Sequence, residues 1–107
     1  MPRPYSEEFI REIKRADSNN MGILLGKACV EANLPLIQVA NILGVSKVSV
    51  YYWFRGRGMR ESLRGKAQAL LDILYKDKAA GILPLNDHKE AKKYAEATRH
   101  LVLDSAQ

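Results

Sequence analysis

Apolar residues recur at helical spacing along most of the chain, in six segments that are separated by turn-forming residues. Within each segment the aliphatic side chains stand three and four positions apart, and runs of β-branched residues are scarce. This pattern predicts an all-α protein. The predicted helices span residues 6–16, 21–32, 36–43, 47–55, 60–80 and 86–104.

The third and fourth predicted helices are separated by only three residues, Gly44-Val45-Ser46. A glycine in so short a connection suits the sharp turn of a helix-turn-helix. Gly44 can adopt a positive φ without steric cost and end the first helix. The Ser46 hydroxyl can accept from backbone N–H groups of the next turn and begin the second helix. With Val50 and Trp53 on the inner face, we predict a helix-turn-helix at residues 35–55.

The rest of the chain is expected to support this motif within one helical domain, residues 6–107. Ser6 is the predicted N-cap of the first helix. Residues 1–5 are predicted to form a flexible arm, in which Arg3 belongs to a frayed terminus or contacts a minor groove or phosphate. The helix at 36–43 is apolar nearly all round, so the helix at 6–16 or a second subunit is expected to cover part of it.

The apolar stripes also predict which side chains are buried. Cys29 falls on the apolar side of the second helix, which favours a small core residue over a reactive thiol. The short apolar connector at residues 82–85 is expected to pack against the core. The last helix, residues 86–104, is predicted to bury Ala91, Tyr94, Ala95, Thr98, Leu101 and Val102.

The net charge of +5 is concentrated beside the helix-turn-helix. Residues 1–45 carry five charges of each sign, and residues 67–107 carry six of each. Residues 46–66 hold six cations against Glu61 alone, so the whole excess lies in this segment. Such clustering is typical of a surface that binds a polyanion. The alternative is a solvated basic face without a partner.

The composition argues against several other classes of function. A single cysteine excludes an intramolecular disulfide, and no His or Cys residues follow the spacing of zinc ligands. No nucleophile–base pair, metal cluster or phosphate-binding loop is present, so we expect neither an enzyme nor a cofactor. The N-terminus lacks the apolar core of a signal peptide, and no stretch approaches 18 apolar residues. We therefore expect a soluble cytoplasmic, nucleoid-associated protein with no membrane partner.

Two runs within the motif resemble a known family. Val39-Ala40-Asn41-Ile42-Leu43-Gly44-Val45-Ser46 is similar to the first motif helix and turn of the Cro/repressor-type, or lambda-repressor-like, helix-turn-helix family. Val50-Tyr51-Tyr52-Trp53-Phe54-Arg55-Gly56 is similar to the family's recognition helix, and the resemblance extends from about residue 21 to 74. It implies a sequence-specific DNA-binding transcriptional regulator, a repressor of bacterial or phage type, that acts as a homodimer.

Several positions depart from the family pattern. Leu36 stands where many members hold a phosphate with a glutamine. Phe54 and Cys29 stand where members often pair a glutamate with an arginine, which predicts that packing replaces a polar pair. Ile42 is apolar at a position that is usually polar. With Ile37 and the last helix it gives a candidate dimer surface; alternatively, this apolar side binds a host protein such as a component of the transcription machinery.

The resemblance also implies roles for the exposed side chains of the recognition helix, residues 47–55. Lys47 can donate to guanine O6 and N7, Val48 can contact a thymine methyl group, and Tyr52 can donate to a base edge or phosphate. Tyr51 is either half-buried or a phosphate donor. The Arg-Gly-Arg-Gly run also suggests RNA binding, but one short copy is a weak signal. The predicted phosphate contacts on double-stranded DNA are Ser46, Ser49, Tyr51, Arg55, Arg57 and Arg60.

Overall fold

The computed structural model describes residues 4–105, which form six helices and no strand. The all-α prediction is therefore confirmed, and each helix lies within two residues of its predicted bounds. Arg3, one candidate for a minor-groove contact, lies outside the described residues. The helices are α1 (Glu7–Arg15), α2 (Met21–Ala32), α3 (Leu36–Leu43), α4 (Lys47–Phe54), α5 (Glu61–Ala79) and α6 (His88–Ser105).

Local capping interactions determine where several helices begin and end. The Ser6 hydroxyl accepts a backbone N–H at the start of α1, and the Ser46 hydroxyl does so at the start of α4, where its distance to the Ser49 nitrogen is 3.1 Å. Gly44 ends α3 with a φ of 70°, and Asn33 ends α2 with a φ of 58°. The predicted caps at Ser6, Gly44 and Ser46 are confirmed.

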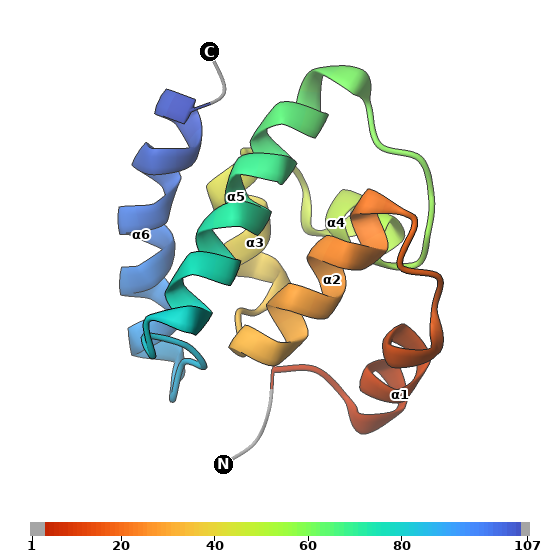
Figure 1. Cartoon of the computed structure of the whole chain (residues 1–107), viewed down its shortest axis with the longest axis horizontal. Coiled ribbons are helices and arrows are strands. Elements are labelled where there is room, and N and C mark those ends of the chain that lie inside the picture. The colour runs from red at the N-terminus through yellow and green to blue at the C-terminus, as the bar shows by residue number, and fades with distance from the viewer. Residues whose placement is uncertain (1–3, 106–107) are drawn as a thin grey trace.

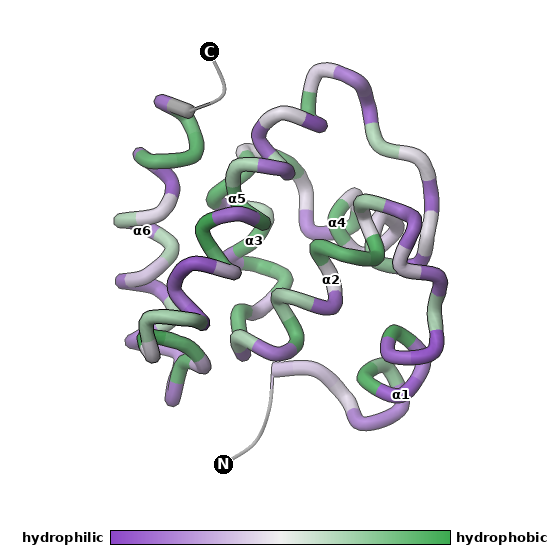
Figure 2. The backbone as a smooth tube through the Cα atoms, in the orientation of Figure 1, coloured by the Kyte–Doolittle hydropathy of each residue, from purple (hydrophilic) through white to green (hydrophobic). Residues whose placement is uncertain are grey.

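The helices pack around α2 and α3, while α1 and α6 lie on opposite sides of the molecule (Figure 1). α2 contacts α1, α4 and α5, and α3 contacts α4, α5 and α6. In Figure 2 the hydrophobic colour is concentrated on α2 and α3, whereas α6 alternates between hydrophilic and hydrophobic segments. This alternation is expected of a helix that has only one face covered.

α6 packs against α3 and covers part of its apolar surface, a role that the sequence had not assigned to this helix. Ile42 on α3 is fully buried, so its predicted place in a dimer surface is wrong, although Ile37 remains 48% exposed. α1, one of the two alternatives expected to cover part of α3, packs mainly against α2, and cover by a second subunit stays a prediction. Leu101 was expected on the buried stripe of α6 but is 55% exposed; the stripe consists of Ala91, Ala95, Thr98 and Val102.

Two glycines within α2 allow its neighbours to approach its backbone closely. A Cβ atom on Gly22 would lie 2.4 Å from the carbonyl oxygen of Trp53, at the end of α4. A Cβ atom on Gly26 would lie 2.4 Å from Cδ1 of Ile13 in α1 and 2.9 Å from Cγ of Phe54. The C-terminal turn of α4 therefore rests directly on α2. The hydrophobic pattern gave no sign of this contact, because a glycine inside a helix registers only as lost helix propensity.

Two segments outside the helices are fixed near the C-terminal end of α2. Tyr5 is buried and its hydroxyl donates to the carbonyl oxygen of Leu34 at 2.5 Å, so the predicted flexible arm does not include Tyr5. The backbone N–H of Leu85 donates to the Ala32 carbonyl oxygen at 2.8 Å. The side-chain amide of Asn33 donates to the carbonyl oxygen of Leu85 at 3.1 Å. The connector thus packs against the core, as predicted.

Burial favours the protonated forms of the buried Cys29 and the half-buried Tyr94. Cys29 is fully buried, and its burial raises the pKa of the thiol well above its usual value, which agrees with the predicted core role. Phe54 is buried as well, so both positions that depart from the polar pair of the family are core positions. Burial, together with a 2.6 Å hydrogen bond from the Tyr94 hydroxyl to Asp77, raises the pKa of Tyr94.

Candidate nucleic-acid interface

α4 has one buried face and one exposed face. Val50, Trp53 and Phe54 are buried against the rest of the fold. Lys47 in the first turn is exposed, and Val48 beside it is 61% exposed, the largest fraction among the exposed large hydrophobic residues of the described chain. The first turn of α4 therefore presents one cation and one apolar side chain to any partner.

The N-terminus of α4 also carries two linked hydroxyl groups. The Ser46 hydroxyl accepts the Ser49 backbone N–H and donates to the Ser49 oxygen, at 3.1 and 3.0 Å. Because the Ser46 proton is used within the pair, the Ser49 hydroxyl proton is left to donate outward. The first turn of α4 contains no acidic residue, so nothing in that turn neutralises the positive end of the helix dipole. This end of α4 is suited to a phosphate group.

Four aromatic rings form a row that runs from the start of α1 to the exposed face of α4. The distances between successive ring centroids are 5.5 Å from Tyr5 to Phe9, 6.2 Å from Phe9 to Tyr51 and 5.8 Å from Tyr51 to Tyr52. Rings at this spacing attract one another, so the two tyrosines of α4 are held in place. Tyr51, whose role the sequence left open, packs against Phe9 yet remains 38% exposed, and Tyr52 is 42% exposed.

Two of the arginines that were predicted to contact phosphate lie over these tyrosines. The Arg57 guanidinium is 4.7 Å from the centre of the Tyr52 ring, and that of Arg55 is 5.9 Å from the centre of the Tyr51 ring. Arg55 also forms an ion pair with Glu12 of α1, and both side chains are exposed. The sequence did not predict this pair, because its members are 43 positions apart. Arg55 is thus already engaged within the protein.

The loop after α4 is anchored at both sides. The backbone N–H of Arg57 donates to the carbonyl oxygen of Tyr52 at 3.0 Å, which folds the loop back on the helix. Gly56 adopts a φ of 95°, and its carbonyl oxygen accepts the side-chain amide of Asn20 at 3.2 Å. Because Asn20 also caps α2, the loop is tied to the start of that helix. Arg60 follows in an exposed position directly before α5.

Most of the basic segment, residues 46–66, has no acidic partner. Within residues 4–105, Arg55 is the one cation of this segment that forms an ion pair. The second ion pair of the described chain joins Glu31 and Lys78 outside this segment. The local charge excess is therefore carried by solvated side chains. The cations without an ion pair are Lys47, Arg57, Arg60 and Arg64, which are exposed, and Lys66, which is half-buried.

Nowhere in the described chain do three His, Cys, Asp or Glu side chains gather closely enough to hold a metal ion. None of the six helices is both long enough and apolar enough to cross a membrane.

Comparisons of the chain with protein-family models, with curated proteins and with solved structures found no match.

Proposed function

We propose that the protein is a sequence-specific regulator of transcription that binds double-stranded DNA and inserts α4 into the major groove. The observation that carries the proposal is the placement of α4, which is fixed by its buried face and exposes Lys47, Val48 and Tyr52 within the basic segment. The major groove of B-DNA admits an α-helix, and its floor carries both polar groups and thymine methyl groups. The resemblance to the Cro/repressor-type family supports the same function.

In this proposal base reading and phosphate binding are divided between two parts of the basic segment. Lys47 donates to a guanine, Val48 contacts a methyl group, and the Tyr52 hydroxyl donates to a base edge or phosphate. The hydroxyls and the backbone at the start of α4 and the arginines after it bind the flanking phosphates. The phosphate-binding set comprises Ser46, Ser49, Tyr51, Arg57 and Arg60, with Arg55 available once it leaves Glu12.

The salt dependence of duplex binding tests the phosphate contacts. A duplex is first selected with the purified protein from a random pool, and its affinity is measured over a range of salt concentrations. Arg57→Ala and Arg60→Ala are each expected to lower the slope of log K against log salt by about 1. Lys92→Ala, which removes an exposed cation of α6, serves as the control and leaves the slope unchanged. Failure to select any duplex, or equal slopes in all four proteins, would refute the proposal.

Dependence on base sequence distinguishes base contacts from phosphate contacts. Lys47→Ala is expected to relax the preference at one base position, at a cost of roughly 1–3 kcal/mol on the selected duplex. Arg60→Ala is expected to weaken binding to all duplexes about equally. A uniform loss with Lys47→Ala would show that Lys47 contacts phosphate and that α4 is not oriented as proposed.

The ion pair between Glu12 and Arg55 gives a third test. Glu12→Gln is expected to tighten duplex binding, because it releases Arg55 for a phosphate and also removes a negative charge. Glu8→Gln on the same helix removes an equal charge from an exposed residue for which the described chain shows no ion pair. Glu12→Gln should therefore have the larger effect. Equal effects of the two variants would show that Arg55 makes no phosphate contact.

We also propose that the DNA-bound form is a homodimer that reads two half-sites about one helical turn apart. Since Ile42 is buried, the dimer would use apolar side chains that remain exposed, such as Leu101 and Leu103 on α6. Sedimentation of the protein with a duplex that carries one or two half-sites measures the stoichiometry. One chain per complete site would refute the dimer.

A further inference from the structure

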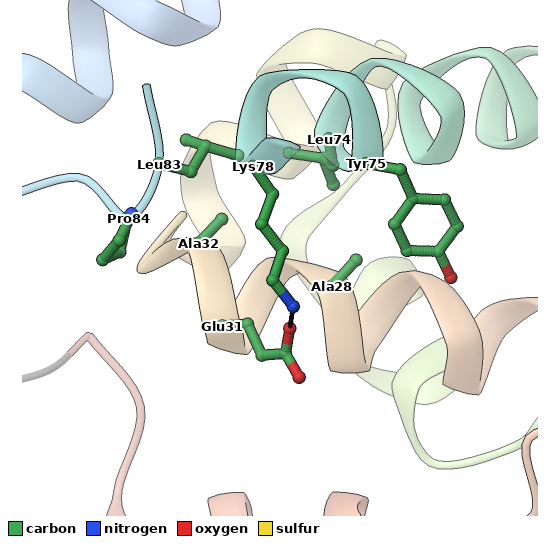
Figure 3. A pocket seen from close by; sticks show the side chains of 8 residues that line it. All are labelled: Ala28, Glu31, Ala32, Leu74, Tyr75, Lys78, Leu83 and Pro84. Atoms are coloured by element: carbon green, nitrogen blue, oxygen red, sulfur yellow. Dashed lines mark hydrogen bonds and ion pairs between the residues drawn. The ribbon is translucent and has the colours of Figure 1, made fainter. Parts of the chain in front are cut away.

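A cavity of about 300 Å³ lies between α2, the C-terminal half of α5 and the connector to α6 (Figure 3). On its α2 side, the short side chains of Ala28 and Ala32, one turn apart, leave room for the cavity. The cavity is separate from the basic segment, since none of its residues falls within 46–66. Its apolar lining consists of Ala28, Ala32, Leu74, Tyr75, Leu83 and Pro84.

The two charged residues of the cavity lining form an ion pair across it. Lys78 of α5 reaches Glu31 of α2, with 2.6 Å between the ammonium nitrogen and a carboxylate oxygen (Figure 3). The two side chains are 62% and 53% exposed. An ion pair that is so exposed contributes little to the free energy of unfolding, so it can open while the fold is retained. Once open, it presents one positive and one negative group beside an apolar surface.

These charges restrict the kind of molecule that fits. A ligand with only a carboxylate would take Lys78 but leave Glu31 unpaired beside a second negative charge. A ligand with only an amine would pair with Glu31 but leave Lys78 unpaired beside a second positive charge. A zwitterion pairs with both side chains, and the apolar lining favours an apolar body. The volume lies at the lower end of the range for ligand pockets, which limits the ligand to a small molecule.

We propose that this cavity binds a zwitterionic small molecule with an apolar body, of the size and kind of a free amino acid with an aromatic or large aliphatic side chain. The ligand carboxylate replaces Glu31 as the partner of Lys78, and the ligand ammonium replaces Lys78 as the partner of Glu31. The apolar part lies over Ala28, on the Tyr75 side of the ion pair. This site does not depend on the proposed DNA contacts.

Calorimetric titration of the full chain tests the site, with phenylalanine, leucine and tryptophan as probes. At least one of these is expected to bind saturably with one molecule per chain. Phenethylamine and 3-phenylpropionate each lack one charge of phenylalanine, and each is expected to bind about tenfold or more weakly than the best probe. The absence of saturable binding by all three amino acids would overturn the proposal, as would equal binding by the two half-ligands.

Two variants locate the binding. Lys78→Met keeps the length of an exposed side chain and removes its charge, and is expected to weaken amino-acid binding about tenfold or more. Lys76→Met, on the same helix but outside the cavity lining, is the matched control and leaves binding unchanged. The folded state of both variants is checked by circular dichroism. Equal affinities of the two variants would place any observed binding elsewhere on the protein and overturn the assignment.

Discussion

A single methyl group at residue 22 is expected to disturb the contact that positions α4. Gly22→Ala places a Cβ atom 2.4 Å from the carbonyl oxygen of Trp53 and 2.9 Å from its carbonyl carbon. These are backbone atoms, so no side-chain rotation relieves the contact, and the end of α4 must move away from α2. Because α4 carries Lys47 and Val48, a shift of this helix would also change the surface proposed to enter the major groove.

The magnitude follows from two opposing effects. Replacing glycine by alanine inside a helix stabilises it by roughly 0.5–1 kcal/mol through the unfolded state and helix propensity. Overpacking at a close contact costs typically about 1–3 kcal/mol. Gly65 in α5 provides a matched control, since a Cβ atom there meets nothing within 4 Å and only the favourable effect applies. Gly22→Ala should therefore be less stable than Gly65→Ala by about 1–3 kcal/mol.

Urea denaturation followed by circular dichroism measures this difference. The urea midpoint of Gly65→Ala is expected to be higher than that of the unchanged protein. The midpoint of Gly22→Ala is expected to be lower than that of Gly65→Ala, and the m-values should be similar. Gly26→Ala should also be less stable than Gly65→Ala, because its Cβ would lie 2.4 Å from Cδ1 of Ile13 and 2.9 Å from Cγ of the buried Phe54 ring. Equal free energies of unfolding for Gly22→Ala and Gly65→Ala would refute the close approach of α4 to α2.

Three further predictions concern other parts of the molecule. Replacing the contacted thymine by uracil in the selected duplex should weaken binding by about 0.8 kcal/mol, the contribution of one buried methyl group. In Val48→Ala the thymine and uracil duplexes should bind equally well. A difference that survives in Val48→Ala would refute the contact between Val48 and the methyl group. Ile42→Ala should lower the free energy of unfolding by roughly 2–5 kcal/mol, because Ile42 is fully buried. Ile37→Ala, at a residue that is 48% exposed, should change it by at most about 0.5 kcal/mol. Similar urea midpoints for the two variants would contradict the packing of α3. Burial raises the pKa values of Tyr5 and Tyr94 above 10.0, so the folded state keeps protons that the unfolded state loses, and stability should be present at neutral pH and fall as pH rises through about 10. Tyr94→Phe should make this alkaline loss shallower in urea titrations at successive pH values, and an unchanged pH dependence would show that Tyr94 is not protected in the fold.

The helices and their ends could be predicted because they depend on nearby residues. Gly44 and Ser46 act on the backbone within one turn, so the turn between α3 and α4 could be placed from the sequence. The buried face of α4 was predicted for the same reason, since Val50 and Trp53 are one helical turn apart.

The packing partners of the helices could not be predicted in this way. The apolar side of α3 indicated that something covers Ile42, but the 3.6-residue period does not say which element does so. The error at Leu101 has a similar cause, because a stripe of six candidates is wider than the contact that α6 makes.

The candidate site was predicted in part. The resemblance implied outward positions for Lys47, Val48 and Tyr52, and these side chains are exposed; the basic segment follows from a count of charges. The partners of Arg55 and Arg57 could not be predicted from the sequence. Glu12 lies 43 positions from Arg55, and Arg57 reaches Tyr52 only because the loop folds back on α4.

The packing of α6 against α3 makes the helix-turn-helix segment dependent on a covalently linked partner. A short tether holds its two ends at an effective concentration in the millimolar range, so this association is unimolecular and insensitive to dilution. If the chain were cut within the connector at residues 80–87, the same contact would become bimolecular. A separate peptide of residues 88–107 would then have to be supplied at roughly millimolar concentration to restore the cover that the intact chain always has.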